Sequence, residues 1–231
     1  GVDYRDWNPE TNALIPAIYS KSDFKGKAKN KAALMEAFGL NKDLAQAPLL
    51  GIISRLADQK GFDLVEAVLP QLMARNLTLV ILGTGDEKYH RLLTAMAAKY
   101  PGRLGVKIAF DNSLAHLIEA GADMFLMPSR FEPCGLNQLY SLKYGTIPIV
   151  RATGGLADTV TQVGRTKGAG TGFLFEEYSS EAFLKAIYTA LAAFEDKRLW
   201  KLIMQNAMSQ DFSWSKSAQD YLNLYQRLVE G

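Results

Sequence analysis

The chain has 231 residues, 48% of them hydrophobic and 22% charged, which is typical of one folded domain and excludes a disordered polypeptide. The formal net charge of +2 is too small to indicate binding to nucleic acid or to an anionic membrane, and no apolar run reaches the roughly 20 residues of a membrane span. A single cysteine excludes an intrachain disulfide and a multi-cysteine metal site, and it fits a reducing compartment.

Residues 1–27 contain two prolines and show no sustained hydrophobic period, which predicts a linker or a surface arm. A helical pattern follows from Ala28 to Phe38, and Gly39 is suited to ending that helix. The chain begins with glycine rather than methionine, and we expect it to be part of a longer protein.

From Pro48 onward, short apolar runs alternate with amphipathic segments, as they do in repeated βα units. Continuous apolar runs are typical of parallel strands that are buried on both faces. The pattern therefore predicts an α/β fold with a Rossmann-like, doubly wound parallel sheet. The predicted strands are Leu49–Ile53, Leu77–Leu82, Val106–Phe110, Met124–Met127 and Thr146–Val150.

The last third of the chain opens with a glycine-rich loop over 164–172 and a short apolar run up to Phe175. Three helical patterns follow, which we interpret as packing faces of extra C-terminal helices. We therefore divide the chain into an arm over 1–27, a Rossmann-like domain over 28–212, and a C-terminal helix over 213–231.

In open α/β sheets, ligands bind beyond the carboxyl ends of the strands, so the loops there are the place to search. The loop after the first predicted strand contains Arg55 and Lys60. Two cations at this edge suit a diphosphate, because arginine forms a planar fork and lysine a point charge. A solvated basic loop would show the same residues, and both interpretations stay open.

Phe110 closes the third predicted strand. An aromatic ring at that position could stack on a nucleotide base, but from sequence alone core packing is the favoured interpretation.

The loop after the fourth strand carries the strongest signal. Pro133 disfavours helical conformation at Glu132, so this carboxylate should stand in extended chain just before a helix. Free backbone N–H groups of Gly135, Leu136 and Asn137 would then form an anion site at the start of that helix. A carboxylate for sugar hydroxyls beside a phosphate cradle is what a sugar diphosphate requires.

The alternative is that Glu132 caps the helix and Cys134 is a small buried hydrophobic residue. His90 and His116 lie within helical patterns and are interpreted as surface or packing residues. No group of acidic or histidine residues has the spacing of metal ligands, so we expect no metal and no other cofactor.

Four strings, SRLADQKGFDLV, LGTGD, SRFEPCGLNQLYSLKYGTIPIVRATGGLADTV and DFSW, resemble the bacterial glycogen synthase and plant starch synthase family. Members of that family are retaining GT-B glucosyltransferases that use ADP-glucose. The similarity runs over nearly the whole chain and is most specific from Ser129 to Val160. It implies that the chain corresponds to the C-terminal half of a GT-B fold.

The resemblance also implies roles for single residues. Arg55 and Lys60 match the basic pair that holds the donor diphosphate and stabilises the leaving ADP. Glu132 matches the essential carboxylate near the glucose hydroxyls. Phe110 matches the ring that stacks on adenine. Cys134 and Gly135 match the loop whose backbone touches the sugar, and Leu136 and Asn137 match the helix start that faces the phosphates.

The chain departs from the family pattern at three of its residues. Phe110 stands where tyrosine is frequent, which should preserve stacking but lose a hydroxyl. Asn137 stands where threonine is common, and Tyr140 takes the place of the second glutamate in the Glu-x7-Glu pattern of related retaining families. The family's N-terminal Lys-Thr-Gly-Gly-Leu segment is absent.

We therefore expect the donor-binding C-terminal domain of a glycogen or starch synthase, with ADP-glucose and ADP as ligands. The α-glucan acceptor would bind through the missing N-terminal domain, so the isolated chain should be inactive. Bacterial cytoplasm or plastid stroma would be its compartment. Another retaining GT-B transferase and a non-catalytic nucleotide-binding module are the alternatives.

Overall fold

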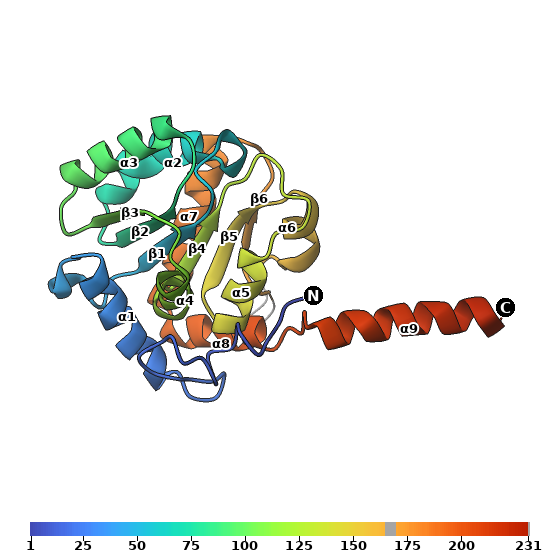
Figure 1. Cartoon of the computed structure of the whole chain (residues 1–231). Helices are drawn as coiled ribbons and strands as arrows, with labels where there is room; N and C mark the ends of the chain where they lie inside the picture. Colours follow the sequence, from blue (N-terminus) through green and yellow to red (C-terminus); the bar gives the residue numbers. More distant parts are fainter. Residues whose placement is uncertain (165–169, 231) are drawn as a thin grey trace.

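A computed structural model describes residues 1–164 and 170–230. Among them, six parallel strands form one sheet in the order β3-β2-β1-β4-β5-β6 (Figure 1). This arrangement confirms the Rossmann-like parallel sheet expected from the sequence. The strands are β1 (Leu49–Ile53), β2 (Thr78–Gly83), β3 (Leu104–Ile108), β4 (Met124–Met127), β5 (Ile147–Arg151) and β6 (Phe173–Phe175).

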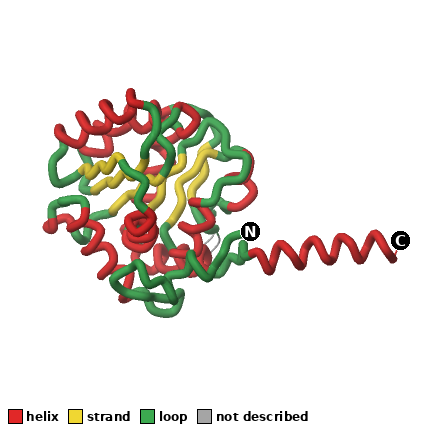
Figure 2. Tube along the Cα trace, viewed as in Figure 1, coloured by secondary structure: helices red, strands yellow, loops and turns green. Residues whose placement is uncertain are grey.

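Helices cover both faces of the sheet, as Figure 2 shows. One apolar core lies between the sheet and α2, α3, α7 and α8, and a second lies between the sheet and α1, α4 and α6. The helices are α1 (Lys25–Ala37), α2 (Phe62–Met73), α3 (Glu87–Lys99), α4 (Asn112–Gly121), α5 (Asn137–Tyr144), α6 (Gly154–Thr159), α7 (Ser180–Glu195), α8 (Lys197–Met208) and α9 (Trp214–Glu230), with 3-10 turns η1 (Lys42–Leu44) and η2 (Asp58–Lys60).

The two cores explain why the strands read as unbroken apolar runs. Leu50 and Ile52 of β1 point into the core beneath α2 and α7, whereas Leu49 points into the core beneath α1 and α4. Side chains alternate between the faces of a strand, so a strand covered on both faces needs apolar residues at every position.

The third strand differs from its predicted bounds. It runs from Leu104 to Ile108 rather than from Val106 to Phe110, because pairing with β2 begins at Leu104 and ends at Ile108. Phe110 therefore lies in the loop beyond the strand. Residues 165–169 of the predicted glycine-rich loop, and Gly231 at the end of the predicted C-terminal helix, lie outside the described residues.

The segment before α1 packs against the domain. Ile15 and Tyr19 are buried, and the Tyr19 hydroxyl donates a hydrogen bond of 2.7 Å to the Tyr144 carbonyl oxygen. At the other end, α9 extends away from the body of the domain (Figure 1). Among the described residues, no helix combines the length and the apolar composition needed to cross a lipid bilayer.

A buried polar network ties α1 and α4 to the start of β5. The Lys27 ammonium donates to Thr146 Oγ1 at 2.7 Å and to the carbonyl oxygens of Ala120 and Tyr144. Burial lowers the pKa of Lys27 to about 7. Glu119 is fully buried nearby, and burial raises its pKa to about 8 although Ser141 Oγ donates to the carboxyl group at 2.8 Å.

The Glu119 carboxyl group makes stability depend on pH. The unfolded chain ionises it near 4.5, whereas the folded chain keeps its proton until about pH 8, so the free energy of unfolding falls as pH rises between these values. Lys27 loses its proton around pH 7 in the folded chain but near pH 10.5 in the unfolded chain. Between these values its titration therefore raises the free energy of unfolding with pH, opposite to the effect of Glu119. Between about pH 5 and about pH 7, the free energy of unfolding of the wild type should therefore fall by roughly 2 to 3 kcal/mol relative to that of Glu119→Gln, which has no carboxyl group to titrate.

Urea unfolding at both pH values measures this difference. Glu181→Gln, which changes an exposed glutamate of α7, is the matched control and should follow wild type. Parallel pH profiles for Glu119→Gln and wild type would contradict the assignment of the pH dependence to Glu119.

Candidate functional site

The site lies where the strand order reverses. From β1 the chain proceeds through β2 and β3 toward one edge of the sheet, and β4 then returns to the other side of β1. Open α/β sheets bind their ligands in the crevice beyond the carboxyl ends of the strands at such a reversal. A cleft of about 950 Å³ occupies the position, lined by residues of both loops, of the loops after β2 and β3, and of α5.

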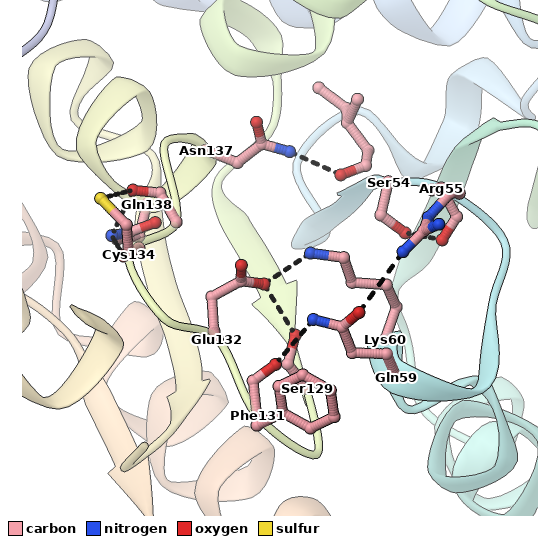
Figure 3. Close-up of polar contacts among 12 residues, drawn as sticks. Ser54, Arg55, Gln59, Lys60, Ser129, Phe131, Glu132, Cys134, Asn137 and Gln138 are labelled. Atoms are coloured by element: carbon pink, nitrogen blue, oxygen red, sulfur yellow. Dashed lines mark hydrogen bonds and ion pairs between the residues drawn. The ribbon is translucent and has the colours of Figure 1, made fainter. Parts of the chain in front are cut away.

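An ion pair joins the two loops at the cleft. Lys60, from the loop after β1, places its Nζ atom 2.5 Å from Glu132 Oε2, from the loop after β4 (Figure 3). The Ser129 hydroxyl donates to the same carboxylate oxygen at 3.3 Å. Glu132 is only 8% exposed, so pairing and hydrogen bonding offset the loss of hydration of its charge.

Hydrogen bonds hold the two loops together. Arg130 N donates to the Gln59 carbonyl oxygen at 2.8 Å, and Gln59 Nε2 donates to the Phe131 carbonyl oxygen at 3.2 Å. Gly61 makes the approach sterically feasible, because it adopts φ +77° and a Cβ atom there would come well inside 3.0 Å of the Pro128 carbonyl oxygen.

Arg55 lines the same cleft as Lys60. Its side chain is exposed, and Nη2 lies 3.4 Å from Gln59 Oε1, which places the guanidinium on the β1 side of the cleft (Figure 3). The structure therefore brings both cations of this loop to one cleft, as the diphosphate interpretation requires.

The start of α5 faces the cleft through Gly135, Leu136 and Asn137. Among the described residues, their backbone N–H groups have no hydrogen-bond acceptor, as expected for the first turn of a helix. The side-chain amide of Asn137 donates from Nδ2 to the Ile53 carbonyl oxygen at 2.6 Å and holds α5 against the end of β1. The helix thus presents free donors and the positive end of its dipole to the cleft.

Glu132 does not cap α5. The N-cap residue is Leu136, which makes no side-chain capping bond, while the Glu132 carboxylate pairs with Lys60. The capping alternative is therefore wrong, because Glu132 precedes the N-cap residue by four positions and its carboxylate is turned to Lys60.

Two further sequence-based alternatives are wrong. Phe110 is 93% exposed and lines the cleft, so it is not a core residue. Cys134 is exposed rather than buried, and its Sγ atom lies 3.5 Å from the Gly135 carbonyl oxygen. Of the predicted site residues, Cys134 is the one whose side chain does not line the cleft.

Sequence reasoning missed other residues that line the cleft. Gln59 and Ser129 lie inside the quoted motifs, and their polar side chains beside Lys60 and Glu132 could have indicated them. Trp7 also lines the cleft, although it belongs to the segment predicted to be an arm. Within the part of the chain that the structure describes, no three His, Cys, Asp or Glu side chains are grouped as metal ligands.

Known proteins with similar sequences and structures carry consistent names. Residues 34–201 match the profile of the family described as glycosyl transferases group 1. A glycogen synthase of Koribacter versatilis is 49% identical over 98% of this chain and 46% of its own length, and one of Anaeromyxobacter sp. is 50% identical over 99% and 48%. The catalytic domain of starch synthase IV from Arabidopsis thaliana, bound to ADP and acarbose, superimposes with a TM-score of 0.91 at 34% identity, over 100% of this chain and 48% of that one.

The sheet order and the cleft at its reversal point define the C-terminal half of a GT-B fold. The chain spans about half the length of the curated relatives it matches. It belongs to the glycosyl transferases group 1 family, and its curated relatives are named glycogen synthase.

Proposed function

We propose that this chain is the donor-binding half of a glycogen or starch synthase. The full-length protein, meaning this chain together with the half that its relatives carry in addition, would transfer glucose from ADP-glucose to the non-reducing end of an α-1,4-glucan with retention. The observation that carries the proposal is the Lys60–Glu132 pair, which places a cation and a carboxylate side by side at the strand-order reversal. The names of the relatives, and the ADP in the similar starch synthase structure, support the choice of donor.

Each part of ADP-glucose has a complementary group in the cleft. The diphosphate would accept hydrogen bonds from the N–H groups at the start of α5 and face the cations Arg55 and Lys60. The adenine ring would stack on Phe110 at the far end of the cleft. Glucose would then lie near Glu132 and Gly135, with the carboxylate available to its hydroxyl groups.

The chemistry needs charge neutralisation on the leaving group. When the bond between glucose C1 and the phosphate oxygen breaks, negative charge develops on ADP. Arg55 and Lys60 would stabilise that charge in a cleft prepared before the reaction, so we propose that transfer needs no metal ion. The carboxylate pairing would hold the Lys60 ammonium in position until the diphosphate binds.

The acceptor would be held between this chain and the other half of the full-length protein. We expect the isolated chain to bind ADP and ADP-glucose but not to synthesise glucan. The test incubates radiolabelled ADP-glucose and glycogen with the isolated chain and with the full-length protein, and counts label in precipitated glycogen. Incorporation by the full-length protein alone is the predicted result. No incorporation by the full-length protein would contradict the proposed function, and incorporation by the isolated chain would contradict its expected inactivity. Names of the bacterial relatives favour a bacterial cytoplasmic location for the full-length protein.

Phe110→Ala should weaken ADP binding to this chain by about five- to tenfold, because loss of a base-stacking ring removes roughly 1 kcal/mol or more. The melting temperature should not change, because the ring is 93% exposed. Calorimetric titration with ADP measures the affinity. Phe131→Ala is the matched control, because Phe131 is 55% exposed close to Glu132 but does not line the cleft. Equal weakening by both variants would contradict stacking at Phe110.

A further inference from the structure

Three aromatic rings from distant parts of the chain form a stack beside the cleft. The Trp7 ring lies 3.8 Å from that of His116 on α4 and 3.8 Å from that of Tyr140 on α5, at interplanar angles of 13° and 5°. The two neighbours cover both faces of the indole. A ligand in the cleft can therefore reach Trp7 only at the edge of its ring.

The edge of Trp7 carries a hydrogen-bond donor that makes no hydrogen bond to any of the described residues. Trp7 lines the cleft together with Ala115 and Asn137. Among residues 1–164 and 170–230, the structure shows no hydrogen bond from Trp7 Nε1, and this atom is accessible rather than buried. A half-buried indole at the wall of a ligand cleft, with its N–H still free to donate, is suited to contacting a polar group of the ligand.

The stack is fixed in place before any ligand binds. His116 is fully buried, and its Nδ1 atom lies 2.6 Å from the Asn12 amide nitrogen. Burial lowers the pKa of His116, and Asp6 Oδ1, 3.9 Å from Nε2, opposes that shift. The Tyr144 hydroxyl lies 3.3 Å from Nδ1. A neutral, packed imidazole therefore supports one face of Trp7 and limits its rotation.

The position of Trp7 relates it to one part of a nucleotide. His116 follows Ala115 in the first half of α4, and Tyr140 lies one turn beyond Asn137 on α5. Trp7 thus stands between the helix that begins beside Phe110 and the helix whose start offers N–H donors to phosphate. In a nucleoside diphosphate that spans these two places, the ribose is the group between base and phosphates.

We propose that the Trp7 indole N–H donates a hydrogen bond to a ribose hydroxyl of the bound nucleotide, which makes Trp7 a nucleotide-recognition residue. This inference rests on the proposed function for the orientation of the ligand.

The first test uses Trp7→Phe, which keeps an aromatic ring in the stack but removes the N–H group. Calorimetric titration of wild type and variant with ADP, 2′-deoxy-ADP and 3′-deoxy-ADP separates the two contributions. We expect Trp7→Phe to bind ADP about five- to tenfold more weakly, and to bind one of the deoxy nucleotides as wild type does. Equal weakening for all three ligands, or unchanged ADP binding, would overturn the inference.

The second test follows tryptophan fluorescence during ADP titration. The chain has three tryptophans, and Trp200 and Trp214 do not line the cleft. The ADP-induced change in emission should persist in Trp214→Phe and disappear in Trp7→Phe, and its persistence in Trp7→Phe would overturn the inference. If wild type binds no ADP at all, the proposed function fails and takes this inference with it, whereas normal ADP binding by Trp7→Phe removes the inference alone.

Discussion

Lys60→Ala is expected to lower glucosyl transfer by the full-length protein by about 10²- to 10³-fold, the range found when a preorganised charge-stabilising group is removed. The substitution removes a cation from the diphosphate and leaves the Glu132 carboxylate, 8% exposed, with Ser129 as its remaining side-chain partner among the described residues. For the isolated chain, ADP affinity should fall by about tenfold or more, because one charge-assisted hydrogen bond is lost. Initial rates with ADP-glucose and titrations with ADP measure the two effects.

The double variant Lys60→Met/Glu132→Gln separates structure from chemistry. It removes both charges of the pair, so it should recover most of the stability lost in Lys60→Ala while transfer stays low. Lys88→Ala is the control for charge alone, because it deletes an exposed lysine that pairs with Asp58 away from the cleft. Transfer at the wild-type rate by the double variant would exclude the proposed role of Lys60.

The second large effect is expected from Gly61→Ala, which should destabilise the chain by about 3 kcal/mol or more. The left-handed backbone at φ +77° is strained for alanine, and the added methyl group would collide with the Pro128 carbonyl oxygen. Because that contact brings the loop after β1 against the loop after β4, the substitution should also disturb the Lys60–Glu132 pair. Urea unfolding measures the stability, and ADP titration reports on the pair.

Gly39→Ala is the matched control for backbone strain. Gly39 adopts φ +64°, and a Cβ atom there would have no neighbour within 4 Å. Its loss of stability should be about 1 kcal/mol, with ADP affinity unchanged. If the two alanine variants lose the same stability, then loop contact at Gly61 contributes nothing and the cleft does not depend on it.

The order of strands and helices could be predicted because each element has its own local sequence pattern, an apolar run for a strand and an amphipathic segment for a helix. Leu49–Ile53 was predicted with the bounds the structure has, since a strand covered on both faces needs an unbroken apolar run. The end of β3 could not be placed, because the apolar run continues to Phe110 while pairing with β2 stops at Ile108. Strand pairing, rather than hydrophobicity, decides such boundaries.

The sequence was sufficient to propose single residues of the cleft but not the contacts between them. Loops after parallel strands meet at one edge, so Arg55, Lys60 and Glu132 could be proposed together. Their pairing could not be predicted, because Lys60 and Glu132 lie 72 residues apart and meet only through the order of β1 and β4. Trp7 gave no local signal, because its place in the cleft depends on stacking with residues of α4 and α5.

The central claim is that this cleft binds the adenine nucleotide of a sugar donor. Calorimetric titration of the folded chain with ADP, ADP-glucose, UDP and UDP-glucose tests it most directly. The same titrations are repeated with the Arg55→Ala variant, which changes a residue of the cleft. The account predicts that ADP and ADP-glucose bind more tightly than their uridine counterparts and that Arg55→Ala weakens them by about tenfold. Preference for the uridine ligands, or binding that is unaffected by Arg55→Ala, would contradict it.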